Sequence, residues 1–452
     1  MKLSSVLALA TAVTAQQFSI ASDDDIKKTA ASVAWDLLQY YHGNETGQTP
    51  GILPGPPASG LGPYYWWEAG AMWGTLLDYW FLTGDDAYND LIMEGIQFQS
   101  GPQKNFMDPN YTLSMGNDDQ GFWGMTALTA AENNFTNPPA DKPQWVALAQ
   151  GVFNDMASPE RWQTDTCGGG LRWQVPFSNV GYNYKNSIAN GCFFNIAARL
   201  ARYTHNDTYA DWAEKVWDWV EGVGYMGKNN DALYDGAHVE DNCTKINEEE
   251  YSYNNAVFTL GAAYMYNYTN GSSKWEGRVN KLVDHGFATF FPNGIAYEPQ
   301  CETSKTCTTD MKSFKGYLHR WYATSTSVAP FLRDKVLPVL KTSAEASIKV
   351  CTGGDNGRQC GFSWAAGQFD GIMGVGPQMN ALGAVSSLLI TETHGTVSKS
   401  TGGSSEGDPT AGGDESTTTK ITTADRAGAG ILTFLVLGST VSLFGWMCFG
   451  DA

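Results

Sequence analysis

The chain has 452 residues and a net charge of −19, from 47 acidic and 28 basic residues. So acidic a chain has no basic footprint for nucleic acid or anionic lipid, and with 42% hydrophobic residues it is too apolar to be disordered. Only 17% of its residues are charged, against about 25% in an ordinary soluble domain, whereas aromatic residues reach 13%.

The first fifteen residues predict a secretory signal peptide. Lys2 supplies the charged start, the stretch from Val6 to Val13 is apolar, and Ala15 ends a small-residue cleavage site. A secreted chain is a substrate for N-glycosylation, and seven acceptor motifs are present. They begin at Asn44, Asn110, Asn134, Asn206, Asn242, Asn267 and Asn270. We therefore expect a secreted glycoprotein that begins after residue 15.

Apolar residues recur at helical spacing over most of the chain. The first run opens with Ser22 as N-cap, with Asp25 three positions later, and Gly43 ends it. Strand-like alternation is scarce. The periodicity predicts twelve helices, at about 22–42, 66–83, 86–99, 119–133, 142–157, 184–204, 208–222, 251–268, 274–290, 311–327, 329–349 and 377–390.

Three turns between these helices share a pattern, in which a long helix, a turn rich in Asn, Gly or Asp, and an aromatic residue follow one another. The three are Thr83-Gly84-Asp85 before Tyr88, His205-Asn206-Asp207 before Tyr209, and Asn270-Gly271-Ser272 before Trp275. This degenerate repeat predicts stacked helical hairpins. Six hairpins closed in a ring form an (α/α)6 barrel, and a linear helical solenoid is the alternative. We predict an all-α barrel of this kind over residues 16–391.

The C-terminal part differs in composition from the helical body. Residues 392–426 are rich in Ser, Thr and Gly and predict an extended stalk. An apolar stretch, 427–450, follows a polar spacer and the small residues Gly412 and Gly413, which is the pattern of a GPI-attachment signal. A C-terminal transmembrane helix is the alternative, but the flanking Lys or Arg residues of such a helix are missing. We expect the attachment site in the stalk and removal of residues 427–452.

Eight cysteines in a secreted chain predict disulfides, although spacing alone does not fix their connectivity. We expect two local bridges and one long-range bridge, namely Cys301–Cys307, Cys351–Cys360 and Cys167–Cys243. Cys448 falls in the removed tail. Cys192, inside an apolar helical run, is then left as a free buried thiol.

Two neighbouring carboxylates, Asp118 and Asp119, lie where a loop turns into an apolar helix. Adjacent Cα atoms are ~3.8 Å apart, so the two carboxyls can approach the ~5–5.5 Å separation of retaining glycosidases. The helix terminus favours an ionised carboxylate, while the repulsion of two close charges raises one pKa. A nucleophile and a proton donor result. The alternative is that Asn117, Asp118 and Asp119 only cap the helix.

Several aromatic residues are further candidates for binding a sugar. The run from Tyr64 to Glu68 contains Trp66 and Trp67 and is a candidate stacking platform, with core packing as the alternative. Trp123 is flanked by glycines that make room for a ligand. With six His and no clustered Cys/His spacing, we expect neither a metal nor a cofactor.

Four motifs in a fixed order resemble glycoside hydrolase family 76, the endo-1,6-α-mannosidases with (α/α)6 barrels. The motifs are Asn117-Asp118-Asp119, Cys167 to Trp173, Tyr184 to Gly191, and Tyr253-Asn254-Asn255. The resemblance covers most of residues 24–390 and implies that Asp118 is the nucleophile and Asp119 the general acid/base. The expected substrate-binding residues are Trp66, Trp67, Trp123, Arg172, Trp173, Lys185, Asn186 and Asn254.

The predicted GPI signal makes the chain similar to the fungal subgroup of this family that acts at the cell wall. The resemblance implies cleavage of the mannose core of GPI glycans and transfer of the attached protein to wall glucan. We thus expect a monomeric transglycosidase on the outer face of the plasma membrane or in the wall. Its donor is a mannose-containing glycan and its acceptor wall glucan, and its GPI lipid is the only membrane contact. The alternatives are a plain endo-1,6-α-mannanase and a non-catalytic mannan-binding surface protein.

Overall fold

The computed structural model describes residues 18–228, 231–391, 395–412, 433–435 and 437–440. The chain separates into one unit that ends at Gly412 and a second that starts at Gly413. The described residues of the second unit are helical. Across the described residues, no helix combines the length and the apolar character needed to cross a bilayer. The predicted signal peptide and most of the predicted GPI tail lie outside the described residues and stay predictions.

Twelve α-helices account for half of residues 18–391, and each corresponds to a helix predicted from periodicity. They are α1 Asp23–Leu38, α2 Trp66–Thr83, α3 Asn89–Phe98, α4 Asn117–Glu132, α5 Trp145–Ala157, α6 Ser187–Thr204, α7 Asp207–Val223, α8 Ser252–Tyr268, α9 Ser273–Phe290, α10 Phe314–Val328, α11 Arg333–Lys349 and α12 Val375–Ser386. The side chain of Ser22 caps α1 by accepting from the N–H of Asp25, as predicted.

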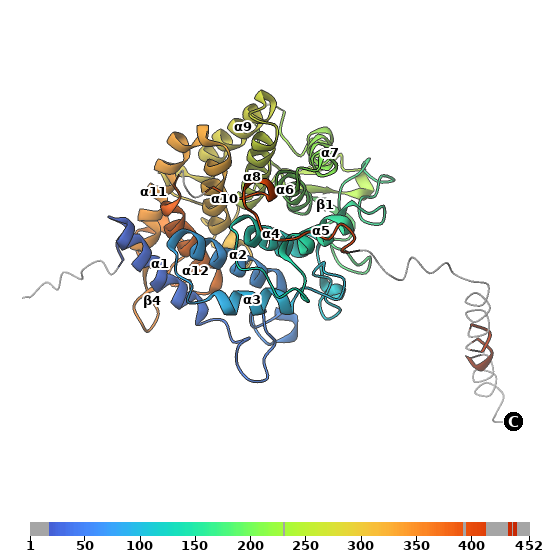
Figure 1. The fold of residues 1–452 in the computed structure, drawn as a ribbon, viewed down its shortest axis with the longest axis horizontal. Coiled ribbons are helices and arrows are strands. Elements are labelled where there is room, and N and C mark those ends of the chain that lie inside the picture. Colours follow the sequence, from blue (N-terminus) through green and yellow to red (C-terminus); the bar gives the residue numbers. More distant parts are fainter. Residues whose placement is uncertain (1–17, 229–230, 392–394, 413–432, 436, 441–452) are drawn as a thin grey trace, which may run out of the picture. The chain divides into compact units, whose positions relative to one another are not determined.

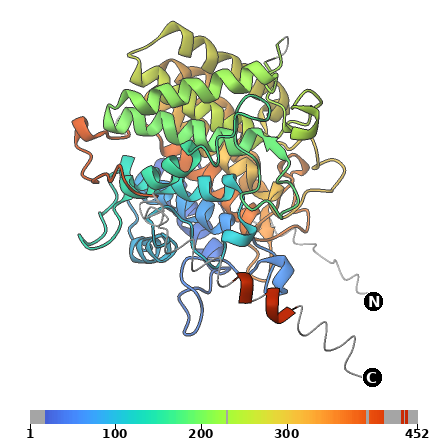
Figure 2. The same ribbon diagram turned by 90° about the vertical axis from the view of Figure 1, so that its right-hand side faces the viewer.

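The even-numbered helices form a closed inner ring. Each of α2, α4, α6, α8, α10 and α12 packs against the next, and α12 closes the ring against α2. The odd-numbered helices lie outside this ring, as Figure 1 shows. From the side, the green and yellow helices of the middle hairpins run next to one another (Figure 2). The predicted (α/α)6 barrel is confirmed, and the solenoid alternative is wrong because the ring closes.

The predicted turns join helices into hairpins. Gly84, with a φ of 77°, ends α2 ahead of α3, and His205, with a φ of 55°, ends α6 ahead of α7. Between α8 and α9, Gly271 has a φ of 88°. These left-handed backbone conformations reverse the chain, and glycine adopts them without steric cost.

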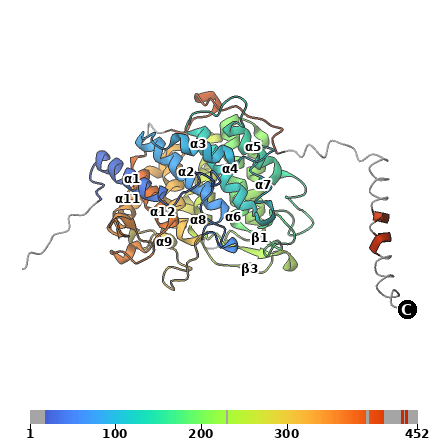
Figure 3. The same cartoon turned by 90° about the horizontal axis from the view of Figure 1, so that it is seen from below.

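One predicted helix starts later than its periodicity suggested. Tyr184–Asn186 forms strand β1 rather than the first turn of α6, because it pairs antiparallel with β2, Gly236–His238. Strand β3, Ile246–Asn247, completes this small sheet, whose strands lie near α6 (Figure 3). A second hairpin joins β4, Cys351–Gly353, to β5, Gln359–Cys360.

Aromatic residues fill the space between the two rings of helices. The largest fully buried side chains include Trp73, Trp123, Trp145, Trp275 and Trp364. The three predicted disulfides are present: Cys167–Cys243, Cys301–Cys307 and Cys351–Cys360. The thiol of Cys192 is free and buried, as expected.

Part of the predicted stalk is folded against the barrel. We call residues 395–412 the strap. Arg202 of α6 donates to the carbonyls of Thr396 (2.6 Å) and Val397 (3.1 Å) at its start. The Ser405 hydroxyl then accepts from the N–H of Val146 at the start of α5. Further along, Asn154 near the end of α5 donates to Pro409 and Ala411.

The strap therefore follows α5 from its first turn to its last. Its Ser-, Thr- and Gly-rich sequence shows no apolar periodicity because hydrogen bonds, rather than an apolar face, hold it on the barrel. The predicted extended stalk does not describe these residues. The rest of the predicted stalk lies outside the described residues.

Candidate active site

Acidic side chains gather where the inner helices begin. Because each outer helix returns the chain antiparallel, the inner helices run parallel and start at the same end of the barrel. We call this the acidic end. Positive helix N-termini favour carboxylates there. Five of the carboxylic residues there are Glu68, Asp118, Asp119, Asp235 and Asp310, each in or next to a segment that leads into an inner helix.

Asp118 and Asp119 occupy the first turn of α4, as their position at a loop-to-helix junction predicted. The indole N–H of Trp173 donates to Oδ2 of Asp118 over 3.1 Å. Oδ2 of Asp119 accepts from the backbone N–H of Gly116 over 2.8 Å. A Cβ on Gly116 would lie 2.2 Å from Oδ1 of Asp118. Any residue other than glycine at this position would therefore displace the carboxylate.

The surroundings of the pair raise the pKa of both carboxyl groups. Burial and the charge of Asp119 raise the pKa of Asp118 well above its ordinary value. Burial and the charge of Asp310 raise the pKa of Asp119 to about 7, against the opposing effect of the Gly116 N–H. Oδ1 of Asp118 is inaccessible and has no hydrogen-bond partner. Helix capping alone does not require a second, unpaired carboxylate, so the capping interpretation explains Asp119 but not Asp118.

Two further carboxylates flank the pair. Oε2 of Glu68 accepts from the N–H of Tyr65 at the start of α2, which repeats the contact of Asp119 with Gly116 at the start of α4. Oδ1 of Asp310 accepts from the Trp67 indole over 3.1 Å. Burial and the charge of Asp310 raise the pKa of Glu68, and burial raises the pKa of Asp310 itself.

On the side of α8, Tyr253, Asn254 and Asp235 complete the acidic end. The Tyr184 hydroxyl donates to Asp235 over 2.7 Å, and the ring of Tyr253 stacks on Phe314. Burial, Asp235 and Asp118 together raise the pKa of the Tyr253 phenol. Asn254 is fully buried and comes near enough to Asp235 to lower its pKa, yet neither end of its amide has a hydrogen-bond partner within 3.5 Å. Such an amide is ready to bind a polar ligand.

The predicted binding residues divide into two groups. Trp173 and Asn254 lie at the acidic end, beside Asp118 and Asp235. Trp67 is buried and contributes through its hydrogen bond to Asp310. Trp66 is half-buried, donates to Gln99 and stacks between other aromatic rings.

The remaining predicted binding residues stabilise the core and the loops next to the site. Trp123 is fully buried in an aromatic stack, so it does not line a surface. The ammonium of Lys185 is enclosed by the carbonyls of Gln163, Thr166 and Gly169. Arg172 donates to Gln163 and to the carbonyl of Tyr182, and Asn186 caps α6. These side chains fix the loops that carry Trp173.

Glu68, Tyr253, Asp235 and Asp310 were not among the predicted site residues. Glu68 and Asp119 occupy equivalent positions, each in the first turn of an inner helix. This equivalence could have identified Glu68 from the sequence. Asp235 and Asp310 have no such signal, because they lie in irregular segments. Within the described ranges of the chain, no group of three or more His, Cys, Asp or Glu residues is placed to hold a metal ion.

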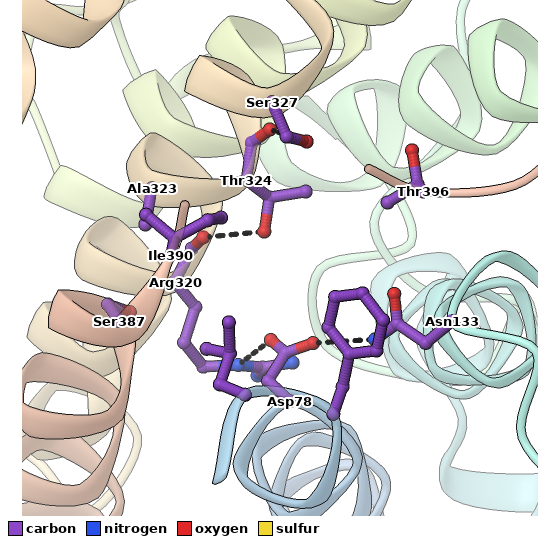
Figure 4. A pocket seen from close by; sticks show the side chains of 11 residues that line it. Asp78, Asn133, Arg320, Ala323, Thr324, Ser327, Ser387, Ile390 and Thr396 are labelled. Carbon is purple, nitrogen blue, oxygen red and sulfur yellow. Dashed lines mark hydrogen bonds and ion pairs between the residues drawn. The ribbon is translucent and has the colours of Figure 1, made fainter. Parts of the chain in front are cut away.

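A small pocket of about 20 Å³, partly open to solvent, lies at the other end of the barrel (Figure 4). Arg320 donates to Oδ2 of Asp78 over 2.7 Å across it, and Asn133 donates to the other carboxylate oxygen over 3.4 Å. Thr396 of the strap also lines the pocket. Its charged groups are thus paired with one another.

Comparisons with known proteins agree with this fold. The profile of glycosyl hydrolase family 76 matches residues 25–400. Two relatives from Saccharomyces cerevisiae are the mannan endo-1,6-alpha-mannosidases DCW1, 42% identical with 94% of each chain covered, and DFG5, 41% identical with 96% of this chain and 94% of that one covered.

Solved structures give the same result. Dfg5 from Chaetomium thermophilum in complex with glucosamine is 51% identical, with a TM-score of 0.85 over 91% of this chain and 100% of that one. An inactive variant of the alpha-1,6-mannanase of Salegentibacter sp. HEL1_6 with alpha-1,6-mannotriose shares the fold, with a TM-score of 0.64 at 16% identity over 80% of this chain and 99% of that one. The chain is an enzyme that belongs to glycosyl hydrolase family 76.

Proposed function

We propose that the chain is a retaining α-mannoside-active glycosidase in which Asp118 is the nucleophile and Asp119 the general acid/base. The observation that carries this proposal is the pair itself, in which two adjacent carboxylates are held by different donors, Trp173 and Gly116. The Salegentibacter mannanase supports it, because its inactive variant has asparagine in place of two consecutive aspartates. The order of the two roles follows the family resemblance.

The proposed reaction is a double displacement. Asp118 attacks the anomeric carbon and forms a mannosyl-enzyme, while Asp119 gives its proton to the departing glycosidic oxygen. In the second step Asp119 takes a proton from an acceptor hydroxyl, which displaces Asp118 and restores the carboxylate. A pKa of about 7 lets Asp119 serve in both steps near neutral pH.

We further propose that the donor is the mannose core of a GPI glycan and that the acceptor is wall glucan. The names of the fungal relatives support an α-1,6-linked mannose donor, and Dfg5 was solved with glucosamine. The predicted signal peptide and GPI signal support an extracellular enzyme on the outer face of the plasma membrane or in the cell wall.

The test is a reaction with two substrates. The enzyme is incubated with a GPI-core mannoside and a glucan acceptor, and products are separated by mass. A coupled mannoside–glucan product supports transfer. Release of the mannoside fragment without coupling contradicts transfer and supports hydrolysis.

A plain endo-1,6-α-mannanase is the second candidate, favoured by the activity for which DCW1 and DFG5 are named. It would release oligosaccharides from unbranched α-1,6-mannan with no acceptor present. A non-catalytic mannan-binding protein would instead keep its cellular phenotype after Asp118→Asn or Asp119→Asn. Unchanged phenotypes in both variants would contradict both enzymatic proposals.

A further inference from the structure

Exposed apolar side chains are concentrated at the acidic end. Of the described residues up to Gly412, nine large apolar side chains are exposed, and seven of these lie on the segments that lead into inner helices. Tyr65 and Trp173 belong to the site already described. We call the other five the apolar rim: Leu61, Leu113, Phe177, Val180 and Met373.

Three of the rim residues lie on segments that precede neighbouring inner helices. Leu61 precedes α2, Leu113 precedes α4, and Met373 precedes α12. The start of α12 meets α2 where the N–H of Val375 donates to the Tyr64 hydroxyl. Close to Leu113 in the chain, Tyr111 stacks on Trp66. These contacts place three rim segments beside one another.

Phe177 and Val180 are the most prominent rim residues, at 84% and 95% exposed. They lie on a loop that follows Trp173, whose carbonyl accepts from the N–H of Asn117 at the start of α4. The loop is not held by these two side chains. Its turn is closed by the N–H of Asn179, which donates to the carbonyl of Pro176.

Further contacts fix this loop on the barrel. The N–H of Val175 donates to Met115 over 3.0 Å, and the Asn179 amide donates to Gln174 over the same distance. A Cβ on Gly181 would meet the Trp173 ring at 2.3 Å, so the loop lies directly on that ring. A rigid loop thus presents Phe177 and Val180 to the outside.

The chemistry of the rim favours a lipid surface. Four of its five side chains are aliphatic or thioether groups, which lack the flat ring that stacks on sugars or nucleic-acid bases. Apolar groups that protrude beyond a polar body are typical of surfaces that enter the boundary between headgroups and acyl chains. The carboxylates of the acidic end and a net charge of −19 repel anionic lipids, which leaves a neutral bilayer.

The strap ends at the acidic end of the barrel. Its last residue, Gly412, donates to the carbonyl of Gln103, in the segment between α3 and α4. A Cβ on Gly412 would also lie 3.0 Å from Asp155, close to the end of α5. The sequence that continues from this point contains the apolar stretch 427–450. The rim and Gly412, the last described residue of the strap, therefore lie at the same end of the barrel.

We propose that the apolar rim docks the acidic end onto a neutral phospholipid bilayer. This adds a protein contact to the lipid link that the sequence predicts. If the proposed function holds, docking brings Asp118 and Asp119 to the membrane surface, where the mannose core of a lipid-linked glycan lies. The docking itself does not depend on the reaction.

A fluorescence experiment on the full chain tests this proposal. An environment-sensitive dye is attached at Ser178→Cys, between Phe177 and Val180, in a Cys448→Ser background; Cys192 is buried and does not compete. A matched control carries the dye at Ser273→Cys, an exposed position at the start of an outer helix. Each protein is bound to phosphatidylcholine vesicles that contain lipids with a quencher in the acyl chain.

We expect the dye at position 178 to be quenched and to shift its emission to shorter wavelength, while the dye at position 273 stays bright. Adding Phe177→Ser and Val180→Ser should reduce quenching at position 178 to the control level. Equal quenching at both positions, or none at position 178, overturns the proposal. So does an emission shift at position 178 caused by soluble glucan but not by vesicles.

A second readout separates this proposal from the proposed function. Cleavage of soluble α-1,6-mannotriose by the Phe177→Ser/Val180→Ser variant should match that of the unaltered enzyme. If the unaltered enzyme leaves mannotriose intact but its position-178 dye is quenched, the proposed reaction fails and the docking stands. The reverse outcome rejects docking and leaves the reaction in place.

Discussion

The catalytic pair at one end of the inner ring and the buried carboxylates at the other end have different hydrogen-bond partners. Where the inner helices end, Glu132 forms a two-pronged ion pair with Arg199, at 2.7 and 3.0 Å, and also accepts from the Tyr264 hydroxyl. We call this the paired end; Asp78 and Arg320 form its second ion pair. At the acidic end, Glu302 is paired with Lys315, whereas Asp118, Asp119 and Asp310 accept from uncharged N–H donors.

This difference indicates that one set of carboxylates stabilises the fold and the other serves catalysis. A buried carboxylate with a guanidinium partner is held ionised and fixed in place. A buried carboxylate beside other carboxylates has a raised pKa and can therefore carry a proton near neutral pH, which is what a general acid needs. The paired end therefore serves to close the barrel, and the acidic end keeps charges in an arrangement that only a substrate completes.

The largest effect is expected from the catalytic pair. Asp118→Asn should lower kcat on α-1,6-mannotriose by about 10⁴-fold or more, because no nucleophile remains. Asp119→Asn should lower it by about 10²- to 10⁴-fold. On a mannoside with an activated leaving group, the Asp119 variant should recover much of its first-step rate, since that group needs no proton. Equal recovery by the Asp118 variant would contradict the assigned roles.

The same two variants should keep or gain stability, in contrast to any change at the paired end. An amide at position 118 removes the repulsion between neighbouring carboxylates, so its free energy of unfolding should not fall. Denaturant unfolding measures this. A loss as large as that at the paired end would show that the pair is structural.

Glu132→Gln should lower the stability of the protein and leave its kcat unchanged. It leaves the guanidinium of Arg199 buried without a charged partner, which costs about 3–5 kcal/mol in the free energy of unfolding. The folded fraction should retain its kcat, because Glu132 is at the far end of α4 from Asp118. Denaturant unfolding and active-site titration together check both parts. A loss of kcat without a loss of stability would erase the distinction between the two ends.

A smaller effect is expected at Trp173. Trp173→Phe removes the N–H that donates to Asp118, and a hydrogen bond to a charged group contributes about 1.5–3 kcal/mol. We expect kcat to fall by about 10- to 100-fold. Without that donor the pKa of Asp118 rises further, so the acid limb of the pH profile should move to higher pH. Trp145→Phe, which removes an indole bond to Thr136, is the matched control and should leave the profile unchanged.

The smallest effect concerns the proton of Asp119. Asp310 raises the pKa of Asp119, so Asp310→Asn should lower that pKa. Since the general acid must be protonated, the alkaline limb of kcat/KM should move to lower pH, by about one unit or less. Asp408→Asn on the strap changes the charge equally and should not move the limb. A shift to higher pH after Asp310→Asn would contradict the electrostatic assignment.

The sequence predicts those parts of the site that depend on neighbouring residues. Asp118 and Asp119 are adjacent, so a loop-to-helix junction suffices to place them. Trp123 shows the limit of this reasoning. Its neighbouring glycines indicated space for a ligand, but a Cβ on Gly124 would lie 3.0 Å from Ile196, and one on Gly121 would lie 2.5 Å from the Cβ of Cys192. The glycines let helices approach closely, and Trp123 fills the core.

Residues that meet only through the ring closure were beyond sequence reasoning. Asp310 reaches the acidic end because α10 lies in the same ring as α2, where Trp67 donates to it. Lys185 was predicted to bind substrate, but its ammonium group donates to three carbonyls of one loop. Composition likewise predicted a stalk for the strap, whose contacts with α5 and α6 are hydrogen bonds between distant segments.

The central claim is that the acidic end performs a double displacement through Asp118. The direct measurement is to trap the intermediate with a slow fluorinated α-mannosyl donor, digest the protein and locate the attached sugar by mass spectrometry. The account predicts one mannosyl group on Asp118 and a first-formed product of α configuration. A sugar attached to Asp119, or a product of β configuration with no adduct, would contradict it.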